Sequence, residues 1–271
     1  MTPLAARLLS ICLLYGTSQV AHAGPDSLAR TNGSPIVCDA RLALKTAGKV
    51  FAAPLRFKSE EWITTGAIVA GTAILFAVDE PFRSLAQRNQ SQFGDDAASV
   101  GNFYGHAPHV LIGAGAIYLG GLAFHDKQVR MTGLMLIESV TFAGVIASGL
   151  KVIIGRSRPY NDEGAFTYRG FQFRNERMSL PSGHSTVAFA LSAVLAGKIR
   201  STPATVGLYT LAALTAAARV YTDEHWVSDT FLGAAIGTVV GNAVLRLNEE
   251  GETTGLRLTP SPGGLKAELI F

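Results

Sequence analysis

Residues 131–150 read MTGLMLIESVTFAGVIASGL, a run of twenty residues in which Glu138 is the one charged side chain. A helix of this length rises about 30 Å, which matches the hydrocarbon core of a bilayer. The run is therefore long enough to cross a membrane. It leads directly into Lys151-Val-Ile-Ile-Gly-Arg-Ser-Arg158-Pro159, so a group of cations begins where the apolar residues end.

Five further runs contain no Lys, Arg, Asp or Glu, and Gly and Ala are frequent in them. They cover residues 62–78, 107–124, 185–197, 201–218 and 230–245. Small side chains allow helices to pack closely within a membrane. We therefore predict an all-α fold, a six-helix transmembrane bundle. Because several runs are at or below the usual length of a span, a soluble bundle of buried helices is the alternative.

The overall composition supports the membrane interpretation. Charged residues make up 16% of the 271 residues and hydrophobic residues 48%, whereas about 25% charged is usual for soluble domains. The formal net charge is +3 and the basic residues are scattered, so we expect no nucleic-acid partner. Cys12 and Cys38 are too few for a disulfide scaffold or a cysteine-rich metal site.

The two ends of the chain differ from the apolar series. Residues 1–23 have the pattern of a secretory signal peptide, with Arg7 before an apolar stretch and Ala21-His22-Ala23 at the cleavage position. A short N-terminal anchor is the alternative. We expect residues 24–59 to form an N-terminal extension and residues 60–247 the main domain. The tail, 248–271, contains several Gly and Pro residues and is predicted to be irregular or weakly extended.

The first polar cluster follows the 131–150 run. Lys151 and Arg158 are seven residues apart, about two helical turns, so both can face one side at the end of a helix. Pro159 disfavours helical geometry at Arg158, and we predict that the helix frays there and frees the guanidinium. An ammonium and a guanidinium together suit a phosphate dianion. Cations that reach toward the membrane interface are the alternative.

The second cluster is Pro181-Ser182-Gly183-His184, directly before the run at 185–197. Ser182 or Ser185 can cap a helix, whose free N–H groups and dipole favour an anion. Gly183 lets a ligand approach the backbone, and His184 can transfer a proton near neutral pH. An ordinary helix cap beside a histidine is the alternative.

The third cluster is Arg219-x5-His225-x3-Asp229. His225 and Asp229 are one helical turn apart, so the carboxylate can bind one ring nitrogen and leave the other free to attack. Arg219 adds a third cation. A polar turn between two helices, with Trp226 as an interface anchor, is the alternative.

The order and spacing of the three clusters resemble the signature of the type 2 phosphatidic acid phosphatase and vanadium haloperoxidase superfamily. The resemblance covers roughly residues 60–247 and is closest to the membrane lipid phosphatase branch. One departure is visible, because Ala218 stands where the family usually has a serine before the arginine.

The resemblance implies a division of labour among the polar residues. His225 attacks phosphorus and becomes a phosphohistidine, Asp229 orients His225, and His184 protonates the leaving group. No metal or other cofactor is expected, because side-chain cations carry the charge stabilisation. The phosphate oxygens are held by Lys151, Arg158, Ser182, Gly183 and Arg219.

The predicted function is therefore that of a membrane-embedded, metal-independent phosphatase acting on a lipid phosphate or pyrophosphate, with no obligate protein partner. Candidate substrates are phosphatidic acid, phosphatidylglycerol phosphate, undecaprenyl pyrophosphate and lipid A phosphate. Three alternatives remain open. They are a secreted soluble acid phosphatase of the same superfamily, a vanadate-dependent haloperoxidase, and a non-catalytic lipid-binding or channel protein.

Six alternating spans would place all three clusters at one membrane face. The opposite face would carry residues 24–60, with six Lys or Arg residues against three acidic ones, so the positive-inside rule predicts a periplasmic active site in a bacterial-type inner membrane. A cleaved signal peptide would reverse this orientation. Either residues 1–23 are retained or one apolar run does not cross.

Two other features have no decisive spacing. The segment 79–106 is expected to be a polar connector. Arginines and aromatic residues between 168 and 177 suit either a lid over the headgroup or a solvated loop, and Glu138 either pairs within the bundle or lines the pocket.

Overall fold

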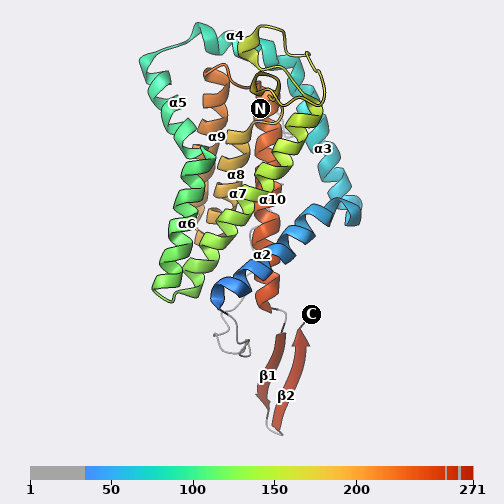
Figure 1. The fold of residues 1–271 in the computed structure, drawn as a ribbon, viewed down its shortest axis with the longest axis vertical. Coiled ribbons are helices and arrows are strands. Elements are labelled where there is room, and N and C mark those ends of the chain that lie inside the picture. Colours follow the sequence, from blue (N-terminus) through green and yellow to red (C-terminus); the bar gives the residue numbers. More distant parts are fainter. Residues whose placement is uncertain (1–33, 254, 262–263, 271) are drawn as a thin grey trace. The chain divides into compact units, whose positions relative to one another are not determined.

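The computed structural model describes residues 34–253, 255–261 and 264–270. Residues 34–253 form a helical bundle (Figure 1). Short 3-10 turns (η1–η4) at Ala53–Arg56, Phe76–Val78, Pro159–Asn161 and Asn175–Arg177 connect its helices. The α-helices are α2 (Pro35–Ala52), α3 (Ser59–Leu75), α4 (Asp79–Arg88), α5 (Gln92–Tyr104), α6 (Ala107–Ala123), α7 (Lys127–Ile154), α8 (Gly183–Ile199), α9 (Thr202–Tyr221) and α10 (Val227–Thr253).

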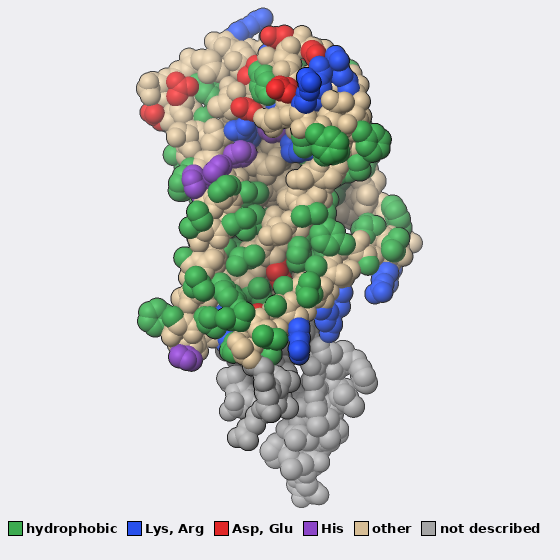
Figure 2. All heavy atoms as spheres, in the orientation of Figure 1, with side chains coloured by type: hydrophobic (Ala, Val, Ile, Leu, Met, Phe, Trp, Pro, Cys, Tyr) green, Lys and Arg blue, Asp and Glu red, His purple; other side chains and the backbone are tan. Residues whose placement is uncertain are grey.

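The six predicted apolar runs correspond to α3 and to α6 through α10, so the all-α prediction is confirmed for the bundle. Within the described residues, three segments are long and apolar enough to cross a membrane: Ser59–Arg88, Lys127–Ile154 and Val227–Glu249. The helix Ala107–Ala123 is apolar but shorter. Figure 2 shows that most charged side chains on the visible face lie at the two ends of the bundle, with hydrophobic side chains between them.

The helix α8 lies at the centre, packed against α7, α9 and α10. Glycines at every fourth position of α10 permit its close approach to α8. A Cβ atom on Gly233 would lie 2.4 Å from the carbonyl oxygen of Ser182, and one on Gly237 would lie 2.3 Å from that of Thr186. At Gly241 the nearest atom would be 2.8 Å away. The two backbones therefore touch, which fixes the start of α8 against the first turns of α10.

The segment 79–106 is largely helical, so the expectation of a polar connector was incomplete. Asp79–Arg88 and Gln92–Tyr104 form α4 and α5, and Ser91 caps α5 by accepting a hydrogen bond from the amide of Gly94 at 3.1 Å. The helix α5 packs against α9, where Gly101 lies close to the backbone of Leu214. Polar composition concealed these two helices because neither is buried on all sides.

The predicted end of α7 was wrong. The helix stops at Ile154, four residues before Arg158, because Gly155 adopts a left-handed conformation with φ of 62°. A Cβ atom there would also lie 2.7 Å from the amide nitrogen of Gly170. Arg158 is extended, with φ −78° and ψ 155°, so it does not share a helical face with Lys151.

The opposite end of the bundle carries its own polar contacts. Asp39 of α2 accepts a hydrogen bond from the hydroxyl of Tyr118 at 2.9 Å and lies 3.1 Å from Nε of Arg130. Deeper in the bundle, buried Glu138 accepts a hydrogen bond from Nδ2 of Asn248 at 2.9 Å. Glu138 therefore pairs within the bundle, as one of the two interpretations predicted.

The C-terminal residues form a separate small unit. The strands β1 (Gly255–Ser261) and β2 (Gly264–Ile270) pair antiparallel, from Gly255 opposite Ile270 to Ser261 opposite Gly264. The helix α10 continues past the predicted boundary at 248, to Thr253, and a regular hairpin follows. The predicted signal peptide, 1–23, lies outside the described residues.

Candidate active site

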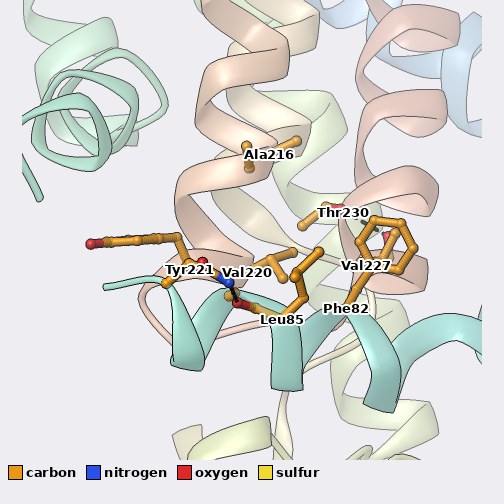
Figure 3. A pocket seen from close by; sticks show the side chains of 10 residues that line it. Phe82, Leu85, Ala216, Val220, Tyr221, Val227 and Thr230 are labelled. Carbon is orange, nitrogen blue, oxygen red and sulfur yellow. Dashed lines mark hydrogen bonds between the residues drawn. The ribbon is translucent and has the colours of Figure 1, made fainter. Parts of the chain in front are cut away.

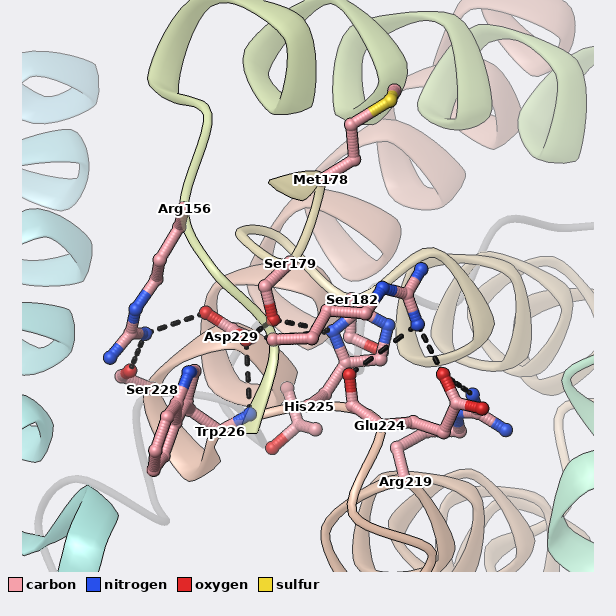
Figure 4. A network of polar contacts seen from close by, with 12 residues as sticks. Arg156, Met178, Ser179, Ser182, Arg219, Glu224, His225, Trp226, Ser228 and Asp229 are labelled. Atoms are coloured by element: carbon pink, nitrogen blue, oxygen red, sulfur yellow. Dashed lines mark hydrogen bonds and ion pairs between the residues drawn. The ribbon is translucent and has the colours of Figure 1, made fainter. Parts of the chain in front are cut away.

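The three polar clusters meet at one end of the bundle, although they are far apart in sequence (Figure 4). Lys151 lies in the last turn of α7, His184 in the first turn of α8, and Arg219 in the last turn of α9. His225 lies in the turn before α10, and Asp229 in the first turn of that helix. The predicted grouping of these side chains is thus present in the structure.

Asp229 is completely buried and faces Nδ1 of His225. Its Oδ2 atom lies 3.5 Å from that nitrogen, and it also accepts hydrogen bonds from the hydroxyl of Ser179 at 2.5 Å and the amide of Trp226 at 3.0 Å. The same Ser179 hydroxyl is 3.4 Å from Nδ1. These contacts engage Nδ1 and leave Nε2 as the ring nitrogen available for chemistry.

The surroundings of His225 favour its neutral form. Burial lowers the pKa of His225 well below its ordinary value, and the positive charges of Lys151, Arg158 and Arg219 and the neighbouring His184 lower it further. A neutral imidazole keeps the lone pair that a nucleophile needs. His225 is therefore ready to attack at neutral pH without first losing a proton.

Arg158 and Arg219 approach each other through one carboxylate. Both contact Oε2 of Glu224, Arg219 at a distance of 3.2 Å. Arg158 also donates to the carbonyl and the side-chain oxygen of Asn175, each at 2.8 Å, and Arg219 donates to Oδ1 of Asn102 at 2.8 Å. The contacts with Asn175 and Asn102 fix the two guanidinium groups, which converge on a single anionic oxygen. Such an arrangement can bind a phosphate.

The start of α8 supplies the neutral part of the anion site. Ser182 caps the helix by accepting a 3.5 Å hydrogen bond from the amide of Ser185, so one of the two predicted caps is confirmed. Its own amide donates to the carbonyl of Asp229 at 2.9 Å. At Gly183 a Cβ atom would lie 3.8 Å from Cε of Lys151, so this cation lies beside the helix N-terminus.

Lys151 is fixed by the loop that precedes α8. Its Nζ atom donates to the carbonyl oxygens of Met178 at 2.5 Å and Ser179 at 3.2 Å. Two of the three ammonium protons are thus used in positioning, and the third remains for an oxygen of a bound anion. The loop that holds Lys151 also brings the Ser179 hydroxyl to Asp229.

His184 has different neighbours from His225. Its ring centroid lies 5.9 Å from that of His106, which in turn lies 4.2 Å from that of His109. The hydrogen bonds and ion pairs of the described residues link His184 to no carboxylate side chain. One histidine is thus fixed by a carboxylate and the other is not, and the division between nucleophile and acid stays a prediction.

Several residues of the site were not predicted. Arg156 lies within the quoted Lys151–Pro159 sequence but had no assigned role, and its side chain binds Asp229 and Asp79. Glu224 adjoins His225 in sequence, and an acidic residue inside the third cluster was a usable signal. Asp79 and Asn102 lie far away in sequence and carry no local signal.

The arginines of the 168–177 segment lie away from these contacts. Arg169 and Arg177 pair with Glu163 at 3.3 Å and 3.1 Å. Phe171 and Phe173 are exposed. The choice between a lid and a solvated loop stays open. Within residues 34–253, no three His, Cys, Asp or Glu side chains are grouped as ligands of a metal ion would be.

An apolar groove of about 610 Å³ lies beside the polar site, between α4, α9 and α10 (Figure 3). It contains none of the predicted catalytic or phosphate-binding residues, so it is distinct from the anion site. Its lining residues are Phe82, Leu85, Ala86, Asn89, Ala216, Ala217, Val220, Tyr221, Val227 and Thr230.

The comparison with protein families decides the relationship. Residues 132–251 match the model of the PAP2 superfamily, and this range contains all three polar clusters. This part of the chain belongs to the PAP2 superfamily. The residues of α4 and α5, including Asp79 and Asn102, precede the matched PAP2 range.

Two bacterial proteins named lipid A 1-phosphatase are similar to this chain in sequence. The one from Rhizobium johnstonii is 28% identical over 200 residues, covering 68% of this chain and 78% of the relative. The one from Porphyromonas gingivalis is 42% identical over 179 residues, covering 64% of this chain but 36% of the relative. The chain thus spans about a third of the length of the second protein.

A solved PAP2 structure shows the same fold. It is a transmembrane PAP2 type phosphatidylglycerolphosphate phosphatase from Bacillus subtilis, with a TM-score of 0.54 and 20% sequence identity. The match covers 68% of this chain and 95% of that one. This similarity shows the PAP2 fold, and the long apolar segments of the described residues support a membrane protein rather than a soluble bundle.

Proposed function

We propose that this PAP2 protein is a membrane-embedded phosphatase that hydrolyses a lipid phosphate through a phosphohistidine formed at Nε2 of His225. One observation carries the proposal. A buried, neutral histidine is fixed by a carboxylate on one side and faces a converging set of cations and a helix N-terminus on the other.

The reaction begins with in-line attack of Nε2 on phosphorus. The new P–N bond forms while the ester P–O bond breaks, and His184 gives a proton to the departing oxygen. Water then gives a proton to His184 and attacks phosphorus, which breaks the P–N bond and releases inorganic phosphate. Negative charge on the phosphoryl oxygens is stabilised throughout by Lys151, Arg158, Arg219, the Ser182 hydroxyl and the Gly183 amide.

No step of this sequence requires a metal ion, because three side-chain cations carry the charge stabilisation that Mg²⁺ supplies in many phosphoryl transfers. Phosphate release should persist in excess EDTA. Complete loss in EDTA with recovery on adding Mg²⁺ would contradict the metal-independent sequence.

The substrate is a phosphate ester exposed at headgroup depth. Two relatives are named lipid A 1-phosphatase, which makes the 1-phosphate of a lipid A the first candidate. The site lies at the end of the bundle opposite α2, whose basic residues favour a cytoplasmic location. The active site is then periplasmic, in a bacterial-type inner membrane.

The decisive experiment measures phosphate release by the purified full-length chain in detergent. The panel contains lipid A 1-phosphate, phosphatidic acid, phosphatidylglycerol phosphate, undecaprenyl pyrophosphate and water-soluble p-nitrophenyl phosphate, with His225→Ala as the blank. Release from at least one lipid well above the blank is expected. Activity on p-nitrophenyl phosphate alone would favour the acid-phosphatase alternative, and bromination with added vanadate would favour a haloperoxidase.

A further inference from the structure

A second arginine of the first cluster, Arg156, lies entirely inside the protein. All five of its N–H donors are used. Nε and Nη2 donate to the carbonyl of Ala165 at 2.9 Å and 2.7 Å, and Nη2 also donates to Oδ2 of Asp79 at 2.7 Å. Nη1 donates to the hydroxyl of Ser228 and to Oδ1 of Asp229, both at 2.7 Å. Nothing remains of this guanidinium to bind a substrate.

Asp79 completes the group from a distant part of the sequence. Its carboxylate accepts hydrogen bonds from the amide of Ser228 at 2.9 Å and from the Ser228 hydroxyl at 2.6 Å. Asp79, Ser228 and Asp229 are all fully buried, as is Arg156. These hydrogen bonds tie Asp79, the first residue of α4, to the first turn of α10, which also contains Asp229.

Aromatic rings enclose this group and keep water out. The guanidinium carbon of Arg156 lies 4.7 Å from the ring centre of Phe76, 5.3 Å from Trp226 and 5.7 Å from Tyr168. In such a dry environment, charges act over longer distances than at a surface. Two carboxylates and one guanidinium leave one net negative charge, adjacent to Nδ1 of His225.

This charge matches what the proposed reaction creates. When Nε2 bonds to phosphorus while Nδ1 keeps its proton, the imidazole ring becomes a cation. The three substrate-binding cations around His225 oppose that charge, as they oppose protonation of the ring. Oδ2 of Asp229 faces this cation, but Oδ1 binds the Arg156 guanidinium, whose positive charge weakens the stabilisation that Asp229 provides. The negative charge of Asp79 offsets that guanidinium.

We propose that Asp79 and Arg156 are positioning residues for Asp229, which hold its carboxylate oriented toward His225 and leave the buried group with the net negative charge that stabilises the His225 cation. This inference rests on the proposed phosphohistidine reaction. It assigns a part in that reaction to α4, which precedes the residues matched by the PAP2 model.

Substitutions of the two positioning residues should lower kcat for different reasons. Asp79→Asn keeps the shape but removes one negative charge, so the group becomes neutral and kcat should fall about tenfold or more, as expected for a charge acting in a poorly screened site. Arg156→Gln removes the guanidinium that binds both carboxylates, so Asp229 loses its orientation toward His225. Its kcat should approach that of Asp229→Asn.

The experiment compares kcat and KM of full-length variants on the wild-type lipid substrate and on p-nitrophenyl phosphate. Asp79→Asn should lower kcat on both substrates equally while KM stays within about threefold. Asp79→Glu and Arg156→Lys restore the charges and should recover part of the loss. Asp39→Asn is the matched control, because Asp39 is a buried, paired carboxylate at the other end of the bundle, and it should retain wild-type kcat.

A second measurement needs no substrate. Histidine-selective ¹⁵N labelling follows the titration of His225, whose charged and titratable neighbours are Asp229, Lys151, Arg158, Arg219 and His184. Asp79→Asn should shift the His225 titration to lower pH, whereas Asp39→Asn should not. Folded Asp79→Asn protein with wild-type kcat and an unshifted His225 titration would overturn the inference. A wild-type chain without phosphatase activity would overturn the proposed function, and the titration would still test the effect of Asp79.

Discussion

Arg156 and Arg158 are two residues apart and meet opposite surroundings. Arg156 is completely buried between two carboxylates, and all its donors are used within the protein. Arg158 lies with Arg219 and Lys151 on the side of His225 where cations outnumber carboxylates. Glu224 is the shared partner of the two arginines. The balance of charge around each side chain, rather than its residue type, decides which arginine supports the fold of the site and which can bind an anion.

The largest expected effect comes from His225, which lies between the buried group around Arg156 and the substrate-binding cations. His225→Ala removes the proposed nucleophile, so kcat should fall by at least about 10⁴-fold on every phosphate ester. Protein labelled with ³²P substrate and quenched in alkaline denaturant, which preserves the acid-labile P–N bond, should carry phosphohistidine in the wild type and none in the variant. Residual activity within tenfold of wild type would mean that another residue attacks phosphorus.

His184 provides a sharper test, because its loss should depend on the leaving group. His184→Ala should lower kcat/KM on a lipid phosphate by roughly 10²–10⁴, the range for general acid catalysis. The loss on p-nitrophenyl phosphate should be much smaller, since p-nitrophenolate leaves without a proton. Equal losses would assign His184 to phosphate binding instead. Exposed His125, at the turn between α6 and α7, is the control position for His→Ala.

Arg158 tests the cation-rich side of the comparison. Arg158→Lys keeps the charge but loses the planar fork that contacts Glu224 and Asn175, so kcat/KM should fall by roughly 10–100-fold. Arg177→Lys is the matched control, because Arg177 pairs with Glu163 on a loop. If Arg158→Lys behaved like that control, bidentate binding of phosphate by Arg158 would be refuted.

The smallest effect is expected at Glu224, the carboxylate between Arg158 and Arg219. Glu224→Gln removes negative charge from beside the two arginines, so orthovanadate, an analogue of the pentacoordinate transition state, should inhibit about two- to fivefold more strongly. Glu163→Gln should leave the inhibition constant unchanged. Weaker inhibition of Glu224→Gln would show instead that this carboxylate is needed to align the two arginines.

The sequence alone predicted the parts of the molecule whose signals are local. Apolar runs located six helices, and residue spacing placed His225 beside Asp229 and Ser182 at the start of α8. The helix end before Arg158 was misplaced, because the proline at 159 was given more weight than Gly155, whose left-handed backbone ends α7.

The buried charge group could not be predicted in the same way. Asp79 and Ser228 are 149 residues apart and meet only because α4 folds against the first turn of α10. A polar segment of mixed charge, such as 79–106, gives no periodic signal strong enough to show which of its acids points inward. One sequence can therefore reveal residues that act on a ligand more readily than residues that act on one another.

The glycines of α10 also bear on how the enzyme should fail when heated. Because Gly233 and Gly237 bring backbone against backbone, the spacing between Ser182 and the turn containing His225 does not depend on side-chain rotamers. Gradual loosening of the surrounding side chains would leave that spacing intact. Thermal inactivation should then coincide with cooperative separation of the two helices, and activity should be lost abruptly rather than decline over a broad temperature range.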